Sequence, residues 1–300
     1  MQDLKQKSVL KGMLTLGPSA GPTLIGEQCG RHRTVASSWA HPILQSLIKD
    51  DLAERHDDAT YSLTSKGMIH AHRLFGRIVV TIDGPAGAGK TTLAKRVAQA
   101  LGIPYLDTGA MFRGVAQRLG DLSWNRPPES LKHDIGGFRF ALEGEGAASR
   151  IRMDGKLLGE EIRSETVSLW ASNIAVIPIV RTALKRAQRR MGSDTSLVAE
   201  GRDMGTIVFP YAPSKLFLDA KPGIRAERRV KQLRDKGIDA VYEEVLSDIR
   251  KRDAQDRGRA VAPLRPAPDA KFINTSGMNI PDVFEAIMSH VSRTGVTEAA

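Results

Sequence analysis

The sequence contains a single cysteine, Cys29, among its 300 residues. One thiol cannot form a disulfide within the chain, and it cannot supply the Cys-rich cluster of a structural zinc site. Long hydrophobic runs are also missing, because none approaches the ~18 residues of a membrane span. Residues 1–17 carry lysines around a short, interrupted apolar stretch, so we expect no signal peptide. We therefore predict a cytoplasmic protein that does not enter a membrane.

Acidic residues are in deficit, with 34 Asp and Glu against 44 Lys and Arg and a net charge of +10. A basic chain favours polyanionic partners such as nucleotides, nucleic acid or an acidic membrane surface. Net charge alone does not distinguish among these partners, but the positions of the arginines in the sequence help to do so. The length and a hydrophobic content of 41% allow one large domain or two modest ones, and we find no internal repeat.

One stretch, RIVVTIDGPAGAGKTT, organises the chain. Ile78–Ile82 is a short β-branched run that predicts a buried strand. After it, Gly84, Gly89, Lys90 and Thr91 follow the spacing G-x-x-x-x-G-K-[ST], and an amphipathic stretch comes next. The alternative is a glycine-rich turn without a ligand, which the preceding strand and the following helix argue against. The pattern therefore predicts a phosphate-binding loop.

The chemistry of such a loop explains its residue types. Glycines let the chain turn tightly and let backbone N–H groups face a phosphate chain, and the next helix directs the positive end of its dipole at the same anion. Lys90 then reaches the β- and γ-phosphates, and the Thr91 hydroxyl ligates Mg²⁺. The predicted ATP-binding residues are Gly84, Pro85, Ala86, Gly87, Ala88, Gly89, Lys90, Thr91 and Thr92.

Residues 1–76 form a predicted accessory domain ahead of this loop. We expect helices within 1–17 and 22–30, and a longer helix in the run HPILQSLIKDDLAER, whose apolar residues make one helical stripe. A small β-hairpin in HDDATYSLTSKG and a helix at Met68–Leu74 complete the domain. This order resembles a winged helix-turn-helix, and Tyr61–Gly67 is similar to the wing of transcription regulators of that type.

Two interpretations of this accessory domain stay open. In one, it contacts DNA, with Arg31, His32 and Arg33 as the phosphate contacts. In the other, it packs or dimerises, and His32 is an ordinary surface histidine. We see no long linker before Arg77, so we expect this domain to abut the next one, which comprises residues 77–300.

Strands alternate with helices from Ile78 onward, which predicts an α/β fold with a parallel sheet covered on both faces. We predict strands at Ile78–Ile82, Pro104–Leu106, Ser196–Ala199, Lys215–Leu218 and Lys271–Asn274. We predict helices at Thr91–Leu101, Ala110–Leu119, Glu165–Ile174, Ile179–Met191, Pro222–Lys236, Val241–Asp253 and Pro281–Ser292. Between them, Arg139–Leu157 alternates polar and apolar residues around glycines, which indicates a small antiparallel insert.

A phosphate loop indicates a donor, and two segments point to the acceptor. YLDTGAMFR, residues 105–113, follows the second strand with a carboxylate, a hydroxyl and a guanidinium, at the sheet edge where ligands of open α/β sheets bind. Pro178 is well placed to begin a helix. A bend there would bring Ser172 and Arg181 to the same cleft.

Two further segments are rich in arginine. AEGRDMGTIVFP again follows a strand and carries the Arg202–Asp203 pair, and RKRDAQDRGR puts Arg252, Asp256 and Arg259 on one predicted helical face. Three more arginines, Arg225, Arg228 and Arg229, crowd the helix just upstream. A solvated helix face is the alternative for any one arginine, but phosphoryl transfer needs a cationic clamp and a lid that excludes water.

Together these segments resemble the bacterial cytidylate kinases of the nucleoside monophosphate kinase family. The resemblance runs from about Ile78 to His290 and rests on IDGPAGAGKTT, YLDTGAMFR, GEEIRSETVSLWASNIAVIPIVRTALKRAQRR, AEGRDMGTIVFP and RDAQDRGRAVAPL. It implies a P-loop core, a monophosphate-binding region enlarged by a small β insert, and a lid. Phe112 stands where the family usually has Tyr, and the first 76 residues are no part of the usual family chain.

The resemblance implies transfer of the γ-phosphoryl group of ATP, with Mg²⁺, to CMP or dCMP. It implies a CMP site made of Thr108, Arg113, Ser172, Arg181, Arg202, Asp203, Asp256 and Arg259. It implies catalytic roles for Lys90, Arg225, Arg229 and Arg252. The expected partners are thus ATP and CMP or dCMP, with DNA contact through residues 1–76 as a further hypothesis.

Two alternatives to this function remain. One is another small-molecule P-loop kinase, acting on UMP, AMP or shikimate. The other is a DNA-binding regulator whose kinase-like domain senses nucleotides. The segments around Ser172 and Arg202 argue against the first, and the intact Lys90, Thr91 and lid arginines argue for catalysis over sensing.

Overall fold

The computed structural model describes residues 2–294, apart from 17–18, 65, 68–69, 72–73, 75–76 and 236. The chain divides into two compact units, a smaller one built mainly from 1–78 and 185–196 and a larger one built mainly from 79–184 and 197–298. The domain boundary predicted after residue 76 remains a proposal. Each unit is described by itself below.

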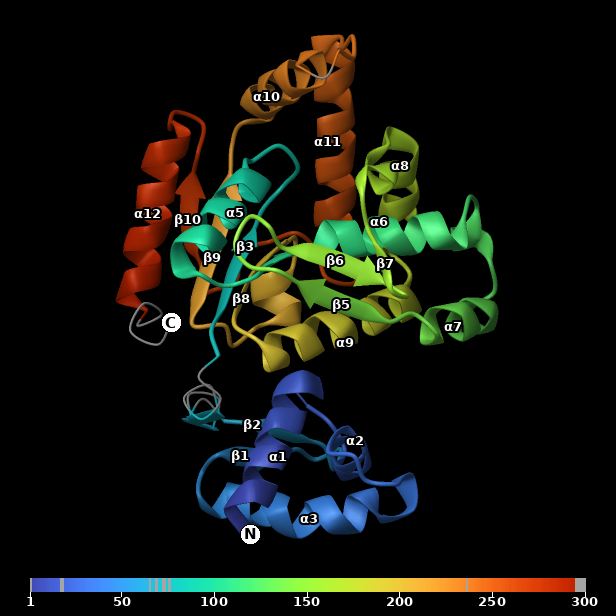
Figure 1. Cartoon of the computed structure of the whole chain (residues 1–300), viewed down its shortest axis with the longest axis vertical. Coiled ribbons are helices and arrows are strands. Elements are labelled where there is room, and N and C mark those ends of the chain that lie inside the picture. Colours follow the sequence, from blue (N-terminus) through green and yellow to red (C-terminus); the bar gives the residue numbers. More distant parts are fainter. Residues whose placement is uncertain are drawn as a thin grey trace. The chain divides into compact units, whose positions relative to one another are not determined.

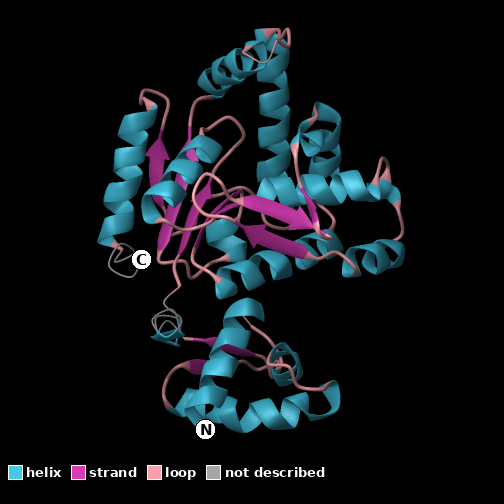
Figure 2. Cartoon of the chain, viewed as in Figure 1, coloured by secondary structure: helices cyan, strands magenta, loops and turns pink. Residues whose placement is uncertain are grey.

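The larger unit is built on a five-stranded sheet with the strand order β10–β9–β3–β8–β4 (Figure 1). Every neighbouring pair in this sheet is parallel. Helices surround the sheet (Figure 2), so the predicted α/β class is confirmed. The strands are β3 (Val79–Asp83), β4 (Tyr105–Asp107), β8 (Leu197–Gly201), β9 (Ser214–Asp219) and β10 (Lys271–Asn274).

Strand register places the polar strand ends side by side. β3 is buried at all five positions, as expected for a central strand of β-branched residues. Its last residue, Asp83, is level with Gly201 of β8 and Phe217 of β9, and Asp107 of β4 is level with Glu200. The carboxyl ends of four strands therefore meet at one edge, where ligands of open α/β sheets bind.

The helices that follow β3 agree with the predicted ones, apart from α7 and from differences of up to five residues at their ends. They are α5 (Lys90–Leu101), α6 (Thr108–Leu119), α7 (Pro128–Gly136), α8 (Glu165–Ile174), α9 (Pro178–Asp194), α10 (Pro222–Arg234), α11 (Tyr242–Gly258) and α12 (Ile280–Arg293). α7 was not predicted, because it is short and offers only Leu131 and Ile135 as buried apolar residues. α11 runs five residues past the predicted end at Asp253.

Shorter elements complete the larger unit. β5 (Phe140–Glu143), β6 (Arg150–Met153) and β7 (Lys156–Leu157) form the antiparallel insert that was predicted. Two 3₁₀ turns, η1 (Ser123–Asn125) and η2 (Glu160–Arg163), and one π-helical turn, η3 (Met204–Val208), were not predicted. The π-helical turn directly follows Arg202 and Asp203.

The predicted bend between α8 and α9 is confirmed, since the two helices meet at 101°. Within the described residues, no single helix is long and apolar enough to cross a membrane. α8 and α9 taken as a bent pair satisfy the length and composition of a span. After this bend, Ser172 near the end of α8 and Arg181 near the start of α9 line the same pocket.

Within the described part of residues 1–78, three helices and a hairpin follow one another in the predicted order. These are α1 (Gln2–Leu16), α2 (Pro22–Gln28), α3 (Arg33–Lys49), β1 (Ala53–Arg55) and β2 (Tyr61–Leu63). Apolar side chains from all five elements, including Leu10, Ile25, Leu44, Ala53 and Tyr61, share one core. The helix predicted at Met68–Leu74 lies largely outside the described residues.

The helix predicted in the run HPILQSLIKDDLAER ends at Lys49, so the prediction is wrong for the residues that follow. Asp51 adopts a left-handed φ of 59°, and its N–H and that of Leu52 donate to Ile48 O and Leu47 O at 2.9 and 2.8 Å. This pair of bonds is a Schellman cap, which ends the helix although Leu52 continues the apolar phase. Ala53 then begins the first strand of the hairpin.

Candidate active site

The loop between β3 and α5 has the conformation that its glycines permit. Gly84, Gly87 and Gly89 have φ values of 148°, 77° and 86°. A Cβ on Gly84 would lie 2.0 Å from the Leu218 carbonyl oxygen, so no other residue fits there. Gly89 precedes the first turn of α5 without a capping side chain, which leaves the helix N–H groups available to an anion.

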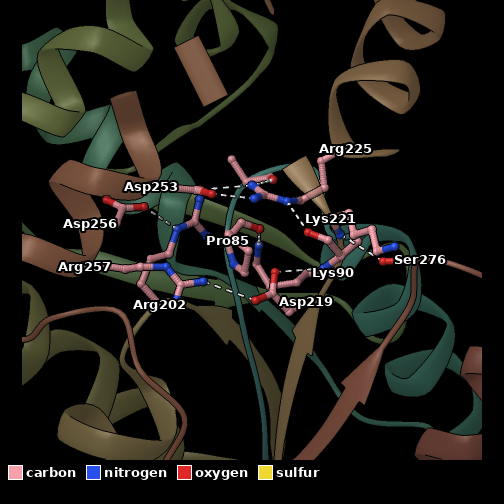
Figure 3. A network of polar contacts seen from close by, with 12 residues as sticks. Pro85, Lys90, Arg202, Asp219, Lys221, Arg225, Asp253, Asp256, Arg257 and Ser276 are labelled. Atoms are coloured by element: carbon pink, nitrogen blue, oxygen red, sulfur yellow. Dashed lines mark hydrogen bonds and ion pairs between the residues drawn. The ribbon is translucent and has the colours of Figure 1, made fainter. Parts of the chain in front are cut away.

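Lys90 lies inside this loop. Its side chain is buried, and its Nζ donates to the Pro85 carbonyl oxygen at 2.7 Å (Figure 3). Burial, and after it the charge of the nearby Arg202, lower the pKa of Lys90 to about 7, while Glu200 and Asp83 oppose the change. The site therefore holds an amine that is protonated only below about pH 7 in the free protein, and an incoming phosphate would stabilise its charged form.

We expect ATP binding to take up a proton at about pH 8, because Lys90 is neutral above pH ~7 in the free protein and a triphosphate would raise its pKa toward the ordinary value of 10.5. Affinity for ATP should accordingly fall by up to about tenfold per pH unit above that point. Calorimetric titration at one pH in two buffers with different ionisation enthalpies measures the uptake. Equal heats in both buffers would contradict the expectation, and Lys90→Ala serves as the control without uptake.

Glu200 connects the loop to the neighbouring strands. Its Oε1 accepts from Thr91 Oγ1 at 2.8 Å, its Oε2 accepts from the Tyr105 hydroxyl at 2.5 Å, and its backbone oxygen accepts from Thr108 Oγ1 at 2.7 Å. Burial raises the pKa of Tyr105, and Glu200 and Asp107 raise it further, so the phenol stays a donor. The sequence analysis missed Glu200, although a carboxylate in the apolar strand β8 is a usable signal.

The Thr91 hydroxyl and the Glu200 carboxylate are hard oxygen donors, which suits Mg²⁺. Among the described residues, no group of three or more His, Cys, Asp and Glu side chains could hold a metal ion. The donor set therefore fits an ion that takes its other ligands from water and from a nucleotide, as Mg²⁺ does in kinase sites.

Asp83, at the end of β3, was also missed. Its carboxylate accepts from the N–H groups of Met204 and Gly205 at 2.9 and 2.7 Å. Burial raises the pKa of Asp83 to about 7, although these two hydrogen bonds oppose the change. Asp83 thereby ties the strand before the phosphate loop to the turn that follows Arg202 and Asp203.

A second pocket opens beside these strand ends, with about 540 Å³ of space that includes open solvent. Its lining residues are Thr108, Gly109, Phe112, Arg113, Ala171, Ser172, Ala175, Arg181, Gly201, Arg202, Asp203, Arg252, Asp256 and Arg259. All eight residues predicted for the CMP site are in this set, together with Arg252 and Phe112.

Ion pairs order the charged side chains of this pocket. Arg181 pairs with Asp203, and Arg202 Nε donates to Asp256 Oδ2 at 3.0 Å. Arg259 also pairs with Asp256. Burial acts to raise the pKa of Asp256, but the surrounding arginines outweigh burial, so the pKa is lowered and the carboxylate stays ionised.

Positive charge exceeds negative charge in the lining, which has five arginines and two aspartates. The Nε atoms of Arg113, Arg252 and Arg259 are buried and have no hydrogen-bond partner among the described residues. Burial, and after it the charge of Arg202, lower the pKa of Arg252 to about 10. A multiply charged anion such as a phosphate would balance this charge and accept from these donors.

The predicted catalytic arginines lie in different places. Arg252 lines the second pocket. Arg229, on α10, pairs with Glu165 and donates to Gln232 Oε1 at 2.9 Å, outside that lining. Arg259 was predicted on a helical face, but α11 ends at Gly258 and Arg259 has extended backbone angles, so it reaches Asp256 from the loop.

Arg225, on α10, is fully buried in a network of polar contacts (Figure 3). Its Nε donates to Ala220 O at 2.8 Å, and its Nη1 donates to Ala86 O and to Asp253 Oδ1, both at 3.0 Å. Its Nη2 donates to the other oxygen of Asp253. Arg225 thus fastens the phosphate loop to α11, and its predicted catalytic role stays a prediction.

We expect Asp253→Ala to lower the free energy of unfolding by about 3 kcal/mol, because it leaves the buried guanidinium of Arg225 without its carboxylate. Urea denaturation followed by circular dichroism measures this change. Asp248→Ala is the matched control, since Asp248 is exposed on the same helix and pairs only with the exposed Lys251 among the described residues. Equal stability of the two variants would contradict the expectation.

Comparison with known proteins decides the family. The sequence model of the family described as cytidylate kinase matches residues 80–293. The chain belongs to the cytidylate kinase family. A cytidylate kinase of Oleidesulfovibrio alaskensis is 53% identical over 212 residues, which cover 71% of this chain and 97% of that protein.

Two further cytidylate kinases show the same coverage. That of Nitratidesulfovibrio vulgaris strain DP4 is 55% identical over 73% of this chain and 94% of its own length. That of Lawsonia intracellularis is 43% identical over 71% of this chain and 95% of its own length. As a member of the cytidylate kinase family, this protein is an enzyme. It also carries an additional region, because the family match begins only at residue 80.

Proposed function

We propose that the chain transfers the γ-phosphoryl group of ATP to the 5′-phosphate of CMP or dCMP. An oxygen of the acceptor phosphate forms a bond to the γ-phosphorus, the bond to the bridging β–γ oxygen breaks, and ADP leaves with CDP or dCDP. One observation carries the proposal, namely a second pocket with five arginines beside the phosphate loop at the same sheet edge. The relatives named as cytidylate kinases support the choice of acceptor.

The phosphate loop is the proposed donor site. Residues 84–92 cradle the ATP phosphates with backbone N–H groups, and Lys90 supplies the positive charge. Thr91, supported by Glu200, would hold Mg²⁺ there. When bound, the ion supplies charge neutralisation for the transferring phosphoryl group. Arg225 keeps this loop in place through Ala86.

The second pocket is the proposed acceptor site. Arg181, Arg202 and Arg259 surround Asp203 and Asp256, which hold the guanidinium groups in fixed positions. The unpartnered Nε atoms are available to the acceptor phosphate. The remaining proposed contacts to CMP come from Thr108, Arg113 and Ser172.

The proposed mechanism is positioning together with charge neutralisation. The acceptor is already a phosphate anion at neutral pH, so no strong general base is needed. No covalent enzyme intermediate is needed either, since both substrates bind at one sheet edge. Lys90 and Arg252 neutralise the charge on the oxygens of the phosphoryl group during its transfer. Arg229 would contribute in the same way if α10 moved toward the site.

Release of ADP from ATP and Mg²⁺ tests the proposal, with CMP, dCMP, UMP, AMP and shikimate as parallel acceptors. We expect turnover with CMP and dCMP and little turnover with the other three. Turnover with another acceptor alone would replace CMP in the proposal. Binding of ATP without turnover on any acceptor would favour a nucleotide sensor over a kinase.

The family uses ATP, so we further propose that the protein works in the cytoplasm, where ATP and nucleoside monophosphates are supplied. We propose no membrane partner. DNA contact through residues 1–76 is a separate proposal, and the observations that bear on it come from the smaller unit.

A further inference from the structure

A tight turn joins two helices of the smaller unit. The N–H groups of Gly30 and Arg31 donate to Glu27 O and Gly26 O, both at 3.0 Å, and Gly30 has a left-handed φ of 77°. These bonds close the end of α2, and α3 begins three residues after Gly30. Two helices joined by a short glycine-containing turn match the order and the turn of a helix-turn-helix.

Close backbone packing fixes the orientation of α3. A Cβ placed on Gly26 would lie 2.3 Å from the Ala36 carbonyl oxygen, so α2 and α3 meet backbone to backbone at this point. Further along α3, Ala40, Leu44 and Leu47 are buried in the core of the unit. This packing directs the opposite face of α3 outward.

The outward face of α3 is polar. Thr34, Ser38, His41 and Gln45 are exposed and recur at intervals of four, three and four residues, which places them on one stripe. Three of them already make contacts within the unit, because Thr34 Oγ1 lies 3.0 Å from His32 Nδ1, Ser38 Oγ donates to Val35 O at 3.1 Å and His41 Nδ1 lies 3.3 Å from the Tyr61 hydroxyl. Hydroxyl, imidazole and amide groups both donate and accept, so each could exchange its present contact for one to a base. α3 contains no aspartate or glutamate anywhere in its 17 residues.

We propose that α3 binds in the major groove of duplex DNA, where this stripe contacts base edges. The major groove admits an α-helix, and glutamine, serine and threonine side chains are suited to its donor and acceptor pattern. Arg31 and Arg33 are exposed just before and at the start of α3, where Arg31 lies over the Trp39 ring and Arg33 lies 4.0 Å from Glu27, and they are the proposed contacts to the phosphate backbone. The proposal is independent of the kinase activity.

Charge and polarity favour DNA over a protein partner. A protein interface is centred on buried aromatic or other large apolar anchors, and the four residues of the stripe include none, although Val35 beside them is 50% exposed. The tip of the hairpin instead carries the exposed Asp57 and Asp58, which would repel phosphate. α3 is therefore the element that reads the duplex, and the hairpin does not approach the backbone.

Selection of bound duplexes from a random pool by the full-length protein tests the proposal. We expect the selected duplex to bind about tenfold or more tightly than a scrambled duplex of equal length, measured by fluorescence anisotropy. Affinity for both duplexes should fall steeply between about 50 and 200 mM salt. Equal affinity for the two duplexes, or no binding at the lower salt concentration, would overturn the proposal.

Two variants that change net charge equally locate the contact. Ser38→Glu adds a negative charge in the middle of the stripe, and Lys5→Gln removes a positive charge from the exposed side of α1. We expect at least about a tenfold loss of affinity for the selected duplex with Ser38→Glu and less than about twofold with Lys5→Gln. Unchanged far-UV circular dichroism and an unchanged thermal unfolding profile of each variant show that both variants fold.

Equal losses with the two variants would overturn the proposal, because they would show a contact of net charge only. Light scattering without DNA tests the protein alternative. If Ser38→Glu separates a dimer of the wild-type chain and no duplex is bound, the stripe is an interface between two copies, and the DNA proposal fails.

Discussion

Replacing Lys90 by alanine is expected to lower turnover about 10³-fold while the protein stays folded. Lys90 is the buried cation of the phosphate loop, and among the described residues the only hydrogen-bond partner that we find for its Nζ is the Pro85 carbonyl oxygen. The side chain therefore contributes little to the stability of the fold, because water can replace this hydrogen bond when the side chain is removed. The substitution instead removes the positive charge that would stabilise the phosphoryl group during its transfer between the donor and acceptor phosphates.

Steady-state ADP release and thermal unfolding, measured on the same preparation, check this expectation. Arg96→Ala is the matched control, because Arg96 is an exposed cation on the same helix α5. We expect Arg96→Ala to retain near wild-type turnover. If Lys90→Ala does the same, the phosphate loop is not the donor site, and the kinase assignment of its residues fails.

Replacing Arg181 by alanine is expected to lower kcat/KM for CMP about 10²-fold or more, with little change in the KM for ATP. Arg181 lines the acceptor pocket and pairs with Asp203, and its Nη1 donates to Ala175 O at 3.0 Å. The substitution removes one phosphate contact and also releases the Asp203 carboxylate into the pocket. That carboxylate would then repel the monophosphate.

The separate saturation curves for CMP and for ATP distinguish this effect from a loss of folded protein. Arg186→Ala, at an exposed position of the same helix α9, is the control. Asp203→Ala should have a weaker effect on CMP than Arg181→Ala, because it leaves the cation in place. An unchanged dependence on CMP in both Arg181→Ala and Asp203→Ala would remove this pocket as the acceptor site.

Local patterns were enough to predict the sheet, the phosphate loop and the grouping of the arginines. Asp203 and Arg202 follow a strand directly, and Arg181 follows a proline that begins a helix, so their approach to one another is a consequence of topology. The individual roles of these side chains remain predictions. The structure adds which of them pair and which donors stay available.

Other site features depend on contacts between segments far apart in the sequence. Glu200 reaches Thr91 only because β3 and β8 are neighbours in a particular register, and the segments are 109 residues apart. Asp253 reaches Arg225 through the packing of α10 on α11. A carboxylate on a helix surface has the same sequence pattern whether it meets a buried guanidinium or solvent, so the sequence alone could not identify Asp253.

The position of Glu200 has a thermodynamic consequence for the two sites. Its side chain holds Thr91 on the donor side, and its backbone oxygen holds Thr108 on the acceptor side. A ligand that shifts this residue in one site therefore alters the other site. By linkage, any factor by which ATP changes the affinity for CMP must equal the factor by which CMP changes the affinity for ATP. Linkage also makes the stability of the ternary complex independent of the order of binding, and Glu200 is the residue through which the two proposed sites would be coupled.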